Sequence, residues 1–387
     1  MYKILKLNNM APEGLDVFGN GDYHLGDEVT APDAILLRSF NMHEMDIPES
    51  VKAIGRAGSG VNNIPIDKLS KLAIPVFNAP GANANAVKEL ALAAILITAR
   101  NIHRAIDYVH NLKPSNNLKN DIESAKKQYV GYELPNKTLG VIGLGSIGVK
   151  IANAGYDLGM KVLGFDPMIT VNNAINLVPG VKKQDALSEI LKNVDILTIH
   201  IPYKNETKDF ISMNEINLMK NTATIINLSR EEIVNTDAVI EALENKKLDT
   251  YVTDFPNESL IGNPDVLLLP HLGASTKEAE ANCAVMVANS IKSYLENGDI
   301  INSVNFPDVS LVSDTKHRLT ITNLNKPNIV GQFTSLLGNE NININDLSHK
   351  NFKNIGYTIL NLDKSISQKV IEQIQQIDGV IKTNIIS

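Results

Sequence analysis

Three side chains that could share one acid-base reaction each follow an apolar run of the sequence. Arg230, Glu258 and His271 come after runs that end at positions 228, 253 and 269. Hydride transfer at a hydroxy-carbon requires a group that exchanges the hydroxyl proton, and histidine titrates in the right range. A neighbouring carboxylate would fix its tautomer, and a guanidinium can hold a carboxylate through two parallel hydrogen bonds. Taken alone, each residue could equally be an ordinary surface side chain, such as an arginine in a surface ion pair. Together, the three predict hydride transfer on a hydroxy acid.

A glycine-rich turn with the spacing G-x-G-x-x-G lies at Gly143, Gly145 and Gly148. It joins an apolar run to a helical stretch, and a second apolar run ends at Asp166, about 20 residues further on. The helix start offers free N–H groups to a pyrophosphate, and the carboxylate can accept from ribose hydroxyls while it repels a 2′-phosphate. The alternative is a turn that serves packing alone. The complete context predicts NAD, and not NADP, as the cofactor.

Polar residues also follow two apolar runs near the N-terminus. Arg38 and Ser39 follow one run, and a turn containing Ser59 and Gly60 follows another. Backbone N–H groups in such a turn can bind an anion, and Arg38 would add positive charge. From the residues alone, an ordinary turn with a solvated arginine is an equally good interpretation.

Alternating strand and helix signals must position these residues, and they predict parallel sheets covered by helices. The apolar runs fall at 4–7, 34–37, 52–55 and 74–77, and then at 138–142, 161–165, 194–199, 223–228, 250–253 and 266–269. Continuous helices are expected from 84 to about 110 and from 276 to 295. Ligands of a parallel sheet bind at the carboxyl ends of its strands, which is where the polar residues lie.

The last part of the chain has a different order of elements. Strand, helix, strand, strand, helix and strand are expected at 317–322, 329–337, 342–348, 357–362, 366–376 and 380–386. This β-α-β-β-α-β order is typical of the ferredoxin-like arrangement. About 70 residues are marginally stable alone, so pairing with a second copy is expected.

Composition limits the class of protein and its partners. A chain of 387 residues with 43% hydrophobic and 20% charged residues is typical of a soluble protein of two or three domains. The net charge of −7 disfavours nucleic acid, and the single Cys283 excludes an internal disulfide and a cysteine zinc cluster, so no metal site is predicted. No signal peptide or membrane span is evident, and a cytoplasmic protein is expected.

Several segments resemble the D-isomer-specific 2-hydroxyacid dehydrogenases, and the resemblance extends over essentially the whole chain. They are 36–39, 55–63, 75–80, 139–148 and 270–276, of which the last is the most specific. The resemblance implies an α/β protein in which a flavodoxin-like substrate domain is split around a Rossmann domain that binds NAD. A C-terminal ferredoxin-like (ACT) domain and a homodimer or homotetramer are also implied. The boundaries expected are 1–90 with 280–305, 91–279, and 312–387.

The resemblance also implies roles for individual residues. Arg230 would bind and polarise a 2-keto acid, His271 would be the general acid/base, and Glu258 would orient it. Asp166 would hold the adenosine ribose and Asp254 the nicotinamide carboxamide. The other residues expected at the cofactor are Gly143, Gly145, Ser146, Ile147, Gly148, His200, Pro202, Thr207, Leu228, Ser229, Arg230, His271 and Gly273. Those expected at the substrate are Arg38, Ser39, Ser59 and Gly60, with Arg230 and His271.

The activity implied is the NAD-dependent oxidation of D-3-phosphoglycerate to 3-phosphohydroxypyruvate, which begins L-serine biosynthesis. L-serine is the expected effector, at Asn323, Asn325 and Asn343, although so asparagine-rich a chain could show three asparagines by composition alone. Alternatives are a reductase of hydroxypyruvate or glyoxylate, a non-catalytic NAD-sensing interaction protein, and a regulator that acts through its C-terminal domain.

Four features depart from the family pattern, and one of them is Lys88, which stands where a small residue is common. Glu231 stands after the arginine, where glycine is usual, and adds a negative charge there. The segment from Asp254 to Glu258 is one residue shorter than usual. Asn323 and Asn328 replace a histidine and a glycine of serine-inhibited members.

Overall fold

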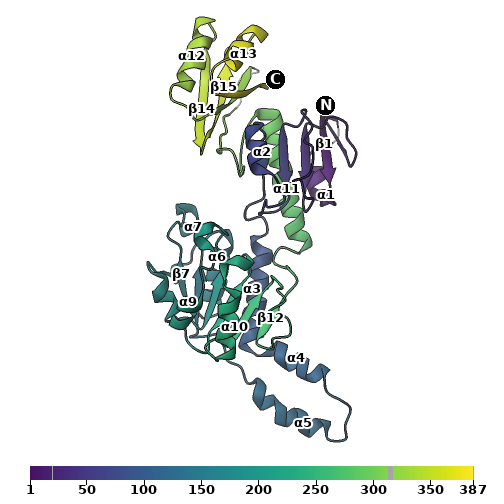
Figure 1. Ribbon diagram of the computed structural model, residues 1–387, viewed down its shortest axis with the longest axis vertical. Helices are drawn as coiled ribbons and strands as arrows, with labels where there is room; N and C mark the ends of the chain where they lie inside the picture. Colours follow the sequence, from purple (N-terminus) through teal and green to yellow (C-terminus); the bar gives the residue numbers. More distant parts are fainter. Residues whose placement is uncertain (20, 313–316, 387) are drawn as a thin grey trace. The chain divides into compact units, whose positions relative to one another are not determined.

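The computed structural model describes residues 1–19, 21–312 and 317–386, which form two compact units (Figure 1). One unit comprises Met1–Asn83 and Lys277–Ser387, and the other is Ala84–Thr276. Residues 313–316 and 387, which belong to the C-terminal domain expected at 312–387, lie outside the described residues. The first unit is therefore discontinuous in sequence, because the second is inserted into it.

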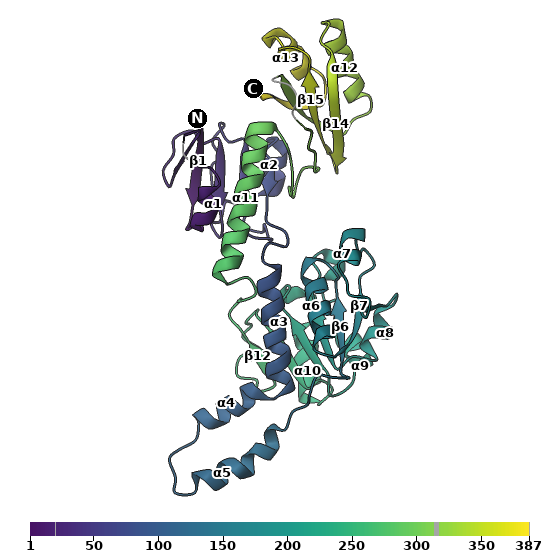
Figure 2. The ribbon, with the colours of Figure 1, turned by 180° about the vertical axis from the view of Figure 1, so that it is seen from behind.

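A five-stranded parallel sheet forms the first part of the discontinuous unit. Its order is β2-β1-β3-β4-β5, made of Tyr23–Gly26, Tyr2–Leu7, Ala34–Leu37, Ala53–Arg56 and Val76–Phe77. Side chains alternate between its faces. Ile4 and Leu36 pack on helix α11, Lys277–Asn297, on one face, whereas Leu5 and Ile35 face Leu69 of α2, Ile66–Lys71 (Figure 2). The short helix α1, Pro12–Asp16, contacts α11.

A four-stranded antiparallel sheet completes this unit. Its order is β14-β15-β13-β16, with two helices, α12 at Ile329–Asn339 and α13 at Gln368–Gln375. The strands β13 to β16 are Arg318–Leu324, Ile344–Phe352, Ile355–Leu362 and Val380–Ile386. Phe333 and Ile374 cover one face, while Tyr357 on the other face joins the core that contains Phe306. The predicted β-α-β-β-α-β order is thus present.

The second unit contains a seven-stranded parallel sheet of order β12-β11-β10-β9-β6-β7-β8. Strands β6 to β12 are Thr138–Ile142, Lys161–Phe165, Lys182–Lys183, Ile196–Ile199, Thr224–Asn227, Thr250–Thr253 and Val266–Leu268. Helices α3, Ala84–Ala99, and α6, Ser146–Asp157, pack on one face. The other face is covered by α8 to α10, Leu187–Leu191, Met213–Leu218 and Thr236–Glu244. A further helix, α7, is Val171–Ile175, and three 3-10 turns are Lys126–Tyr129, Asn205–Thr207 and Glu231–Ile233.

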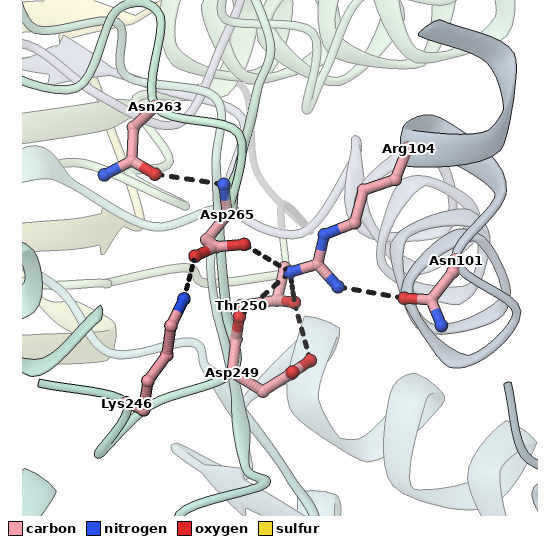
Figure 3. Close-up of polar contacts among 7 residues, drawn as sticks. All are labelled: Asn101, Arg104, Lys246, Asp249, Thr250, Asn263 and Asp265. Atoms are coloured by element: carbon pink, nitrogen blue, oxygen red, sulfur yellow. Dashed lines mark hydrogen bonds and ion pairs between the residues drawn. The ribbon is translucent and has the colours of Figure 1, made fainter. Parts of the chain in front are cut away.

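The helix expected from 84 to about 110 is broken, so this prediction is wrong in one respect. Asn101 has φ +50°, which no right-handed helix accommodates, and α4, Ile102–His110, begins after it. Arg104 attaches α4 to the starts of β11 and β12 (Figure 3). Its guanidinium donates to Asp265 Oδ1 at 2.8 Å, Thr250 Oγ1 at 3.3 Å and the Asp249 carbonyl at 3.1 Å. The next helix, α5 at Leu118–Ala125, lies in a polar, lysine-containing stretch of the sequence.

Two strands were not predicted. β2 holds four residues, of which only Tyr23 is buried, and β8 is a pair of exposed lysines, so neither carries a hydrophobic pattern. The α/β class, with a Rossmann-type parallel sheet and a C-terminal antiparallel sheet, is confirmed. Among the residues that the structure describes, none of the helices combines the length and apolar character needed to cross a bilayer.

Candidate active site

The carboxyl ends of five adjacent parallel strands carry the polar residues of the candidate site. Following the strand order β11-β10-β9-β6-β7, these residues are Asp254, then Ser229 and Arg230, then His200, Gly143 and Asp166. Parallel strands all end at the same side of their sheet, which brings together residues more than 100 positions apart in sequence.

The glycine turn begins directly after β6. Gly143 has φ +85°, and a Cβ there would lie 2.4 Å from the His200 carbonyl oxygen. A Cβ on Gly148 would lie 1.8 Å from the Gly143 carbonyl oxygen. By contrast, a Cβ on Gly145 would meet nothing within 4 Å, so this backbone is open to a ligand. Ser146 and Ile147 begin α6, whose first N–H groups receive no side-chain cap from Gly145.

Asp166 lies at the end of β7 and faces the glycine turn. Its Oδ2 accepts from the Leu144 N–H at 2.8 Å, and its Oδ1 accepts from the Met168 N–H at 2.8 Å. Both oxygens are thereby oriented, and each keeps a lone pair for a ribose hydroxyl. The structure thus brings together the glycines and the carboxylate that the sequence paired.

His200 follows β9 and is held neutral by its surroundings. Its ring Nε2 lies 2.7 Å from Thr198 Oγ1, and burial lowers the pKa of His200 to about 3. Within the described residues, its Nδ1 is buried without a hydrogen-bond partner. Thr207 donates to the Pro202 carbonyl at 2.8 Å and closes the loop after His200.

Asp254 fixes the loop that carries His271. Its Oδ2 accepts from the Gly273 N–H at 2.8 Å, and its carbonyl accepts from the His271 N–H at 2.8 Å. The side chain is buried, and burial raises the pKa of Asp254 against the opposing effects of the Gly273 N–H, His271 and Arg230. In the part of the chain that is described, its Oδ1 has no partner and is available to a ligand donor.

The His271 backbone is strained and its ring is exposed. Its φ of +51° is left-handed, which costs a residue other than glycine about 1–3 kcal/mol and recurs at functional sites. The ring packs edge-on against Phe255, with centroids 5.1 Å apart. The sequence offered no signal for either feature.

Arg230 and Glu231 point to different partners. The buried Asn227 donates to the Arg230 carbonyl at 2.9 Å, and Ser229 Oγ donates to the Ile199 carbonyl at 2.5 Å. The Arg230 guanidinium is exposed and donates to the Ser229 carbonyl at 2.6 Å. Glu231 instead accepts from Asn257 Nδ2 at 2.8 Å, so its extra carboxylate is engaged with the loop after β11.

Glu258 is not bonded to His271. It is exposed, and no hydrogen bond or ion pair between these two side chains occurs among the described residues. Its orienting role stays a prediction. Leu228 is buried in the core beside the site, so only its backbone is available to a cofactor.

The expected anion-binding residues lie in the other unit, after β3 and β4. Arg38 forms an ion pair with Glu280 at 2.7 Å, and its carbonyl accepts from Arg56 Nε at 3.0 Å. Ser59 Oγ donates to the Ala79 carbonyl at 3.3 Å. Ser39 is exposed and Gly60 is half-buried. Arg56 brings a second guanidinium to this position, which the sequence reasoning did not assign.

The three asparagines expected at an effector site are not brought together within one chain. Asn323 and Asn325 lie at the end of β13 beside the start of β15, whereas Asn343 is bonded to Asp363 after the end of β15. Because β15 runs antiparallel to β13, these are opposite ends of the sheet. Asn328 has φ +62°, a conformation that asparagine tolerates and in which glycine is the usual residue.

Sequence comparison finds relatives that extend over most of the chain. Residues 92–273 match the family model described as "D-isomer specific 2-hydroxyacid dehydrogenase, NAD binding domain". D-3-phosphoglycerate dehydrogenase of Escherichia coli K12 is 30% identical over 351 residues, which is 87% of this chain and 82% of that protein. The protein of the same name from Haemophilus influenzae is 31% identical, over 86% and 81% of the two chains.

Solved structures show the same fold. D-mandelate dehydrogenase of Rhodotorula graminis, in its apo form, has a TM-score of 0.67 and 21% identity, and it covers 81% of this chain and 99% of its own. D-lactate dehydrogenase of Escherichia coli has a TM-score of 0.61 and 24% identity, over 79% and 100% of the two chains.

Proposed function

Because this chain belongs to the D-isomer-specific 2-hydroxyacid dehydrogenases, we propose that it oxidises D-3-phosphoglycerate to 3-phosphohydroxypyruvate and so begins L-serine biosynthesis. It is an NAD-dependent dehydrogenase with a Rossmann domain. The observation that carries the substrate assignment is the similarity to D-3-phosphoglycerate dehydrogenases over more than four fifths of both chains. A cytoplasmic homodimer or homotetramer stays part of the proposal.

The residues at the strand ends suit this chemistry. NAD, when bound, supplies the hydride acceptor. The glycine turn and the start of α6 would hold its pyrophosphate, Asp166 would accept from its ribose hydroxyls, and Asp254 Oδ1 would accept from its carboxamide. His271 would take the substrate hydroxyl proton, and Arg230 would grip the carboxylate. Asp254 positions His271 through the backbone of its loop.

The phosphate is assigned to Arg38, Ser39 and the turn of Ser59 and Gly60. We expect D-3-phosphoglycerate to give a higher kcat/KM than D-glycerate in an assay of NADH absorbance. Replacing Arg38 with methionine should lower kcat/KM for the phosphorylated acid about ten- to a hundredfold, since a charge-assisted hydrogen bond is lost, and should hardly change it for D-glycerate. Arg100→Met, at an exposed arginine, is the control.

One observation favours a second candidate, the reduction of glyoxylate or hydroxypyruvate. Arg38 is already paired with Glu280 at 2.7 Å, which reduces the charge it offers to a phosphate. Faster turnover of the unphosphorylated acids, with no loss on Arg38→Met, would replace the first assignment with this one. Adding L-serine to the same assay tests the effector proposal, which predicts inhibition.

A further inference from the structure

A groove in the discontinuous unit lies between its two sheets. The cavity has a volume of about 350 Å³. Tyr2, Lys52 and Tyr294 line it from the N-terminal sheet and α11, and Gln375, Thr383 and Asn384 line it from α13 and β16. Its walls are joined nearby by a buried hydrogen bond, in which the Tyr357 hydroxyl donates to the Gly298 carbonyl at 2.7 Å.

One ammonium group, that of Lys52, lines this groove, and Lys382 lies beside it on β16. Lys52 Nζ lies 3.0 Å from Asp33 Oδ1 and 5.7 Å from the Tyr2 ring centre. Lys382 lies on β16 two residues before Asn384, hence on the same face of the strand. Burial and the nearby charge of Lys52 lower the pKa of Lys382. In the described chain, no hydrogen bond or ion pair is recorded for the Lys382 ammonium.

Among the residues that the structure describes, the carboxylates near Lys52 already have other partners. Asp33 is shared between Lys52 and the Lys3 backbone N–H, which donates to its Oδ2 at 2.8 Å. A second carboxylate, Glu296, acts on the groove residue Tyr2 and accepts from the Tyr23 hydroxyl at 2.8 Å. A half-buried ammonium without a counter-ion is unfavourable, and an anion from solution would supply one. Amide and hydroxyl groups of Gln375, Thr383 and Asn384 can complete the contacts of such an anion.

We propose that this groove binds a small anionic metabolite, a carboxylate or a phosphate monoester, at Lys52 and beside Lys382. The site is separate from the candidate active site and from the three asparagines described above. Because it is lined by both sheets of the unit, a ligand there stabilises the packing of the C-terminal sheet against the N-terminal one. The proposal does not depend on which hydroxy acid the enzyme oxidises.

Isothermal titration calorimetry of the whole chain tests the site, with inorganic phosphate and malonate as separate probes. We expect one of them to bind saturably, and Lys382→Met or Lys52→Met to weaken that binding about ten- to a hundredfold, as the loss of a charge-assisted hydrogen bond does. Lys364→Met, at an exposed lysine before α13, should leave it unchanged. Saturable binding of phosphate alone indicates that the natural ligand is a phosphate monoester. Saturable binding of malonate alone indicates that it is a carboxylate.

A second measurement uses the protein without substitutions, so it tests the proposal even if a variant fails to fold. The bound probe should slow acetylation of Lys382, followed by mass spectrometry, and leave Lys364 unaffected. Absence of saturable binding by either probe, or binding that Lys382→Met does not weaken, overturns the proposal. So does acetylation of Lys382 at an unchanged rate in the presence of a probe that binds.

Discussion

His271 combines a strained backbone with an exposed ring, which allows its chemistry and its conformation to be separated by mutation. Asparagine tolerates the left-handed φ of +51°, so His271→Asn should keep the loop but remove the proton acceptor. We expect kcat to fall by about two to four orders of magnitude. The free energy of unfolding should change by less than about 0.5 kcal/mol. Turnover within tenfold of the native enzyme would exclude His271 as the general base.

His200 should make stability depend on pH. Its pKa is about 3 in the folded chain and 6.5 ordinarily, so below pH 6.5 the unfolded chain takes up a proton that the folded chain does not. Above pH 6.5, His200 is neutral in both states and the free energy of unfolding does not depend on its titration. As the pH falls from 6.5 towards 3, protonation of His200 in the unfolded chain lowers the free energy of unfolding by up to about 1.4 kcal/mol per pH unit. His200→Gln should flatten this dependence in urea unfolding at pH 7.5, 6.0 and 5.0. Parallel curves for the two proteins would contradict it.

Some residues of the site could be predicted from sequence because their positions follow from local rules. The glycines and Asp166 lie one helix apart in a βαβ unit, and the sheet rule places Arg230 and His271 at the same strand ends. The conformations of the loops that carry these residues do not follow from such local rules. The sequence did not reveal that Glu231 bonds to Asn257, that Glu258 is unbonded to His271, or that Arg56 accompanies Arg38.

At the scale of elements, the junction of β6 and α6 contains glycines with different functions. Gly145→Ala meets no atom within 4 Å, so we expect normal stability and weakened NAD binding, because the added methyl group occupies the path of the pyrophosphate. Gly148→Ala would place a Cβ 1.8 Å from the Gly143 carbonyl oxygen, so it should destabilise the fold itself. Thermal unfolding and NADH titration separate the two effects. Equal loss of stability in both variants would refute this distinction.

Arg104 attaches α4 to the neighbouring strands. Lys246 pairs with the same carboxylate, Asp265, but its side chain is much more exposed. Arg104→Leu removes bonds to Asp265, Thr250 and the Asp249 carbonyl and should cost about 1–3 kcal/mol. Lys246→Met, where the side chain is 79% exposed, should cost less than about 0.5 kcal/mol. Urea unfolding of both variants measures the difference, and similar costs would mean that Arg104 does not anchor the helix.

The break between α3 and α4 shows why element boundaries resist prediction. Apolar spacing predicts one long helix through residue 110, and no glycine or proline interrupts it. The break is at Asn101, one of the few residue types that enter the left-handed region readily. Its position is fixed by contacts distant in sequence, such as those of Arg104 with residues near 250 and 265, which no local pattern contains.

At the scale of the whole molecule, Tyr357 connects parts of the discontinuous unit that are far apart in sequence. It is buried in the core shared with Phe306 and α11 and bonds to the Gly298 carbonyl. Tyr357→Phe should lower the free energy of unfolding by about 1–2 kcal/mol because a buried carbonyl loses its donor. Tyr156→Phe, at a tyrosine 46% exposed, should change it little. Hydrogen exchange at the end of α11 should rise in the first variant only; unchanged exchange there would show that Tyr357 does not link these parts.

The short strand β8 has a consequence for the behaviour of the protein at high concentration. A parallel sheet ends in a strand whose outer N–H and C=O groups can recruit a strand from another molecule, which is a route to aggregation. Here that last strand is only Lys182–Lys183, both exposed, with Lys183 paired to Asp185. A strand of two residues offers few backbone hydrogen bonds to an incoming strand. Pairing with it would also remove water from two charged lysine side chains, which is unfavourable. The dipeptide that carried no structural signal in the sequence therefore protects the β8 edge of the nucleotide-binding sheet against the addition of a further strand.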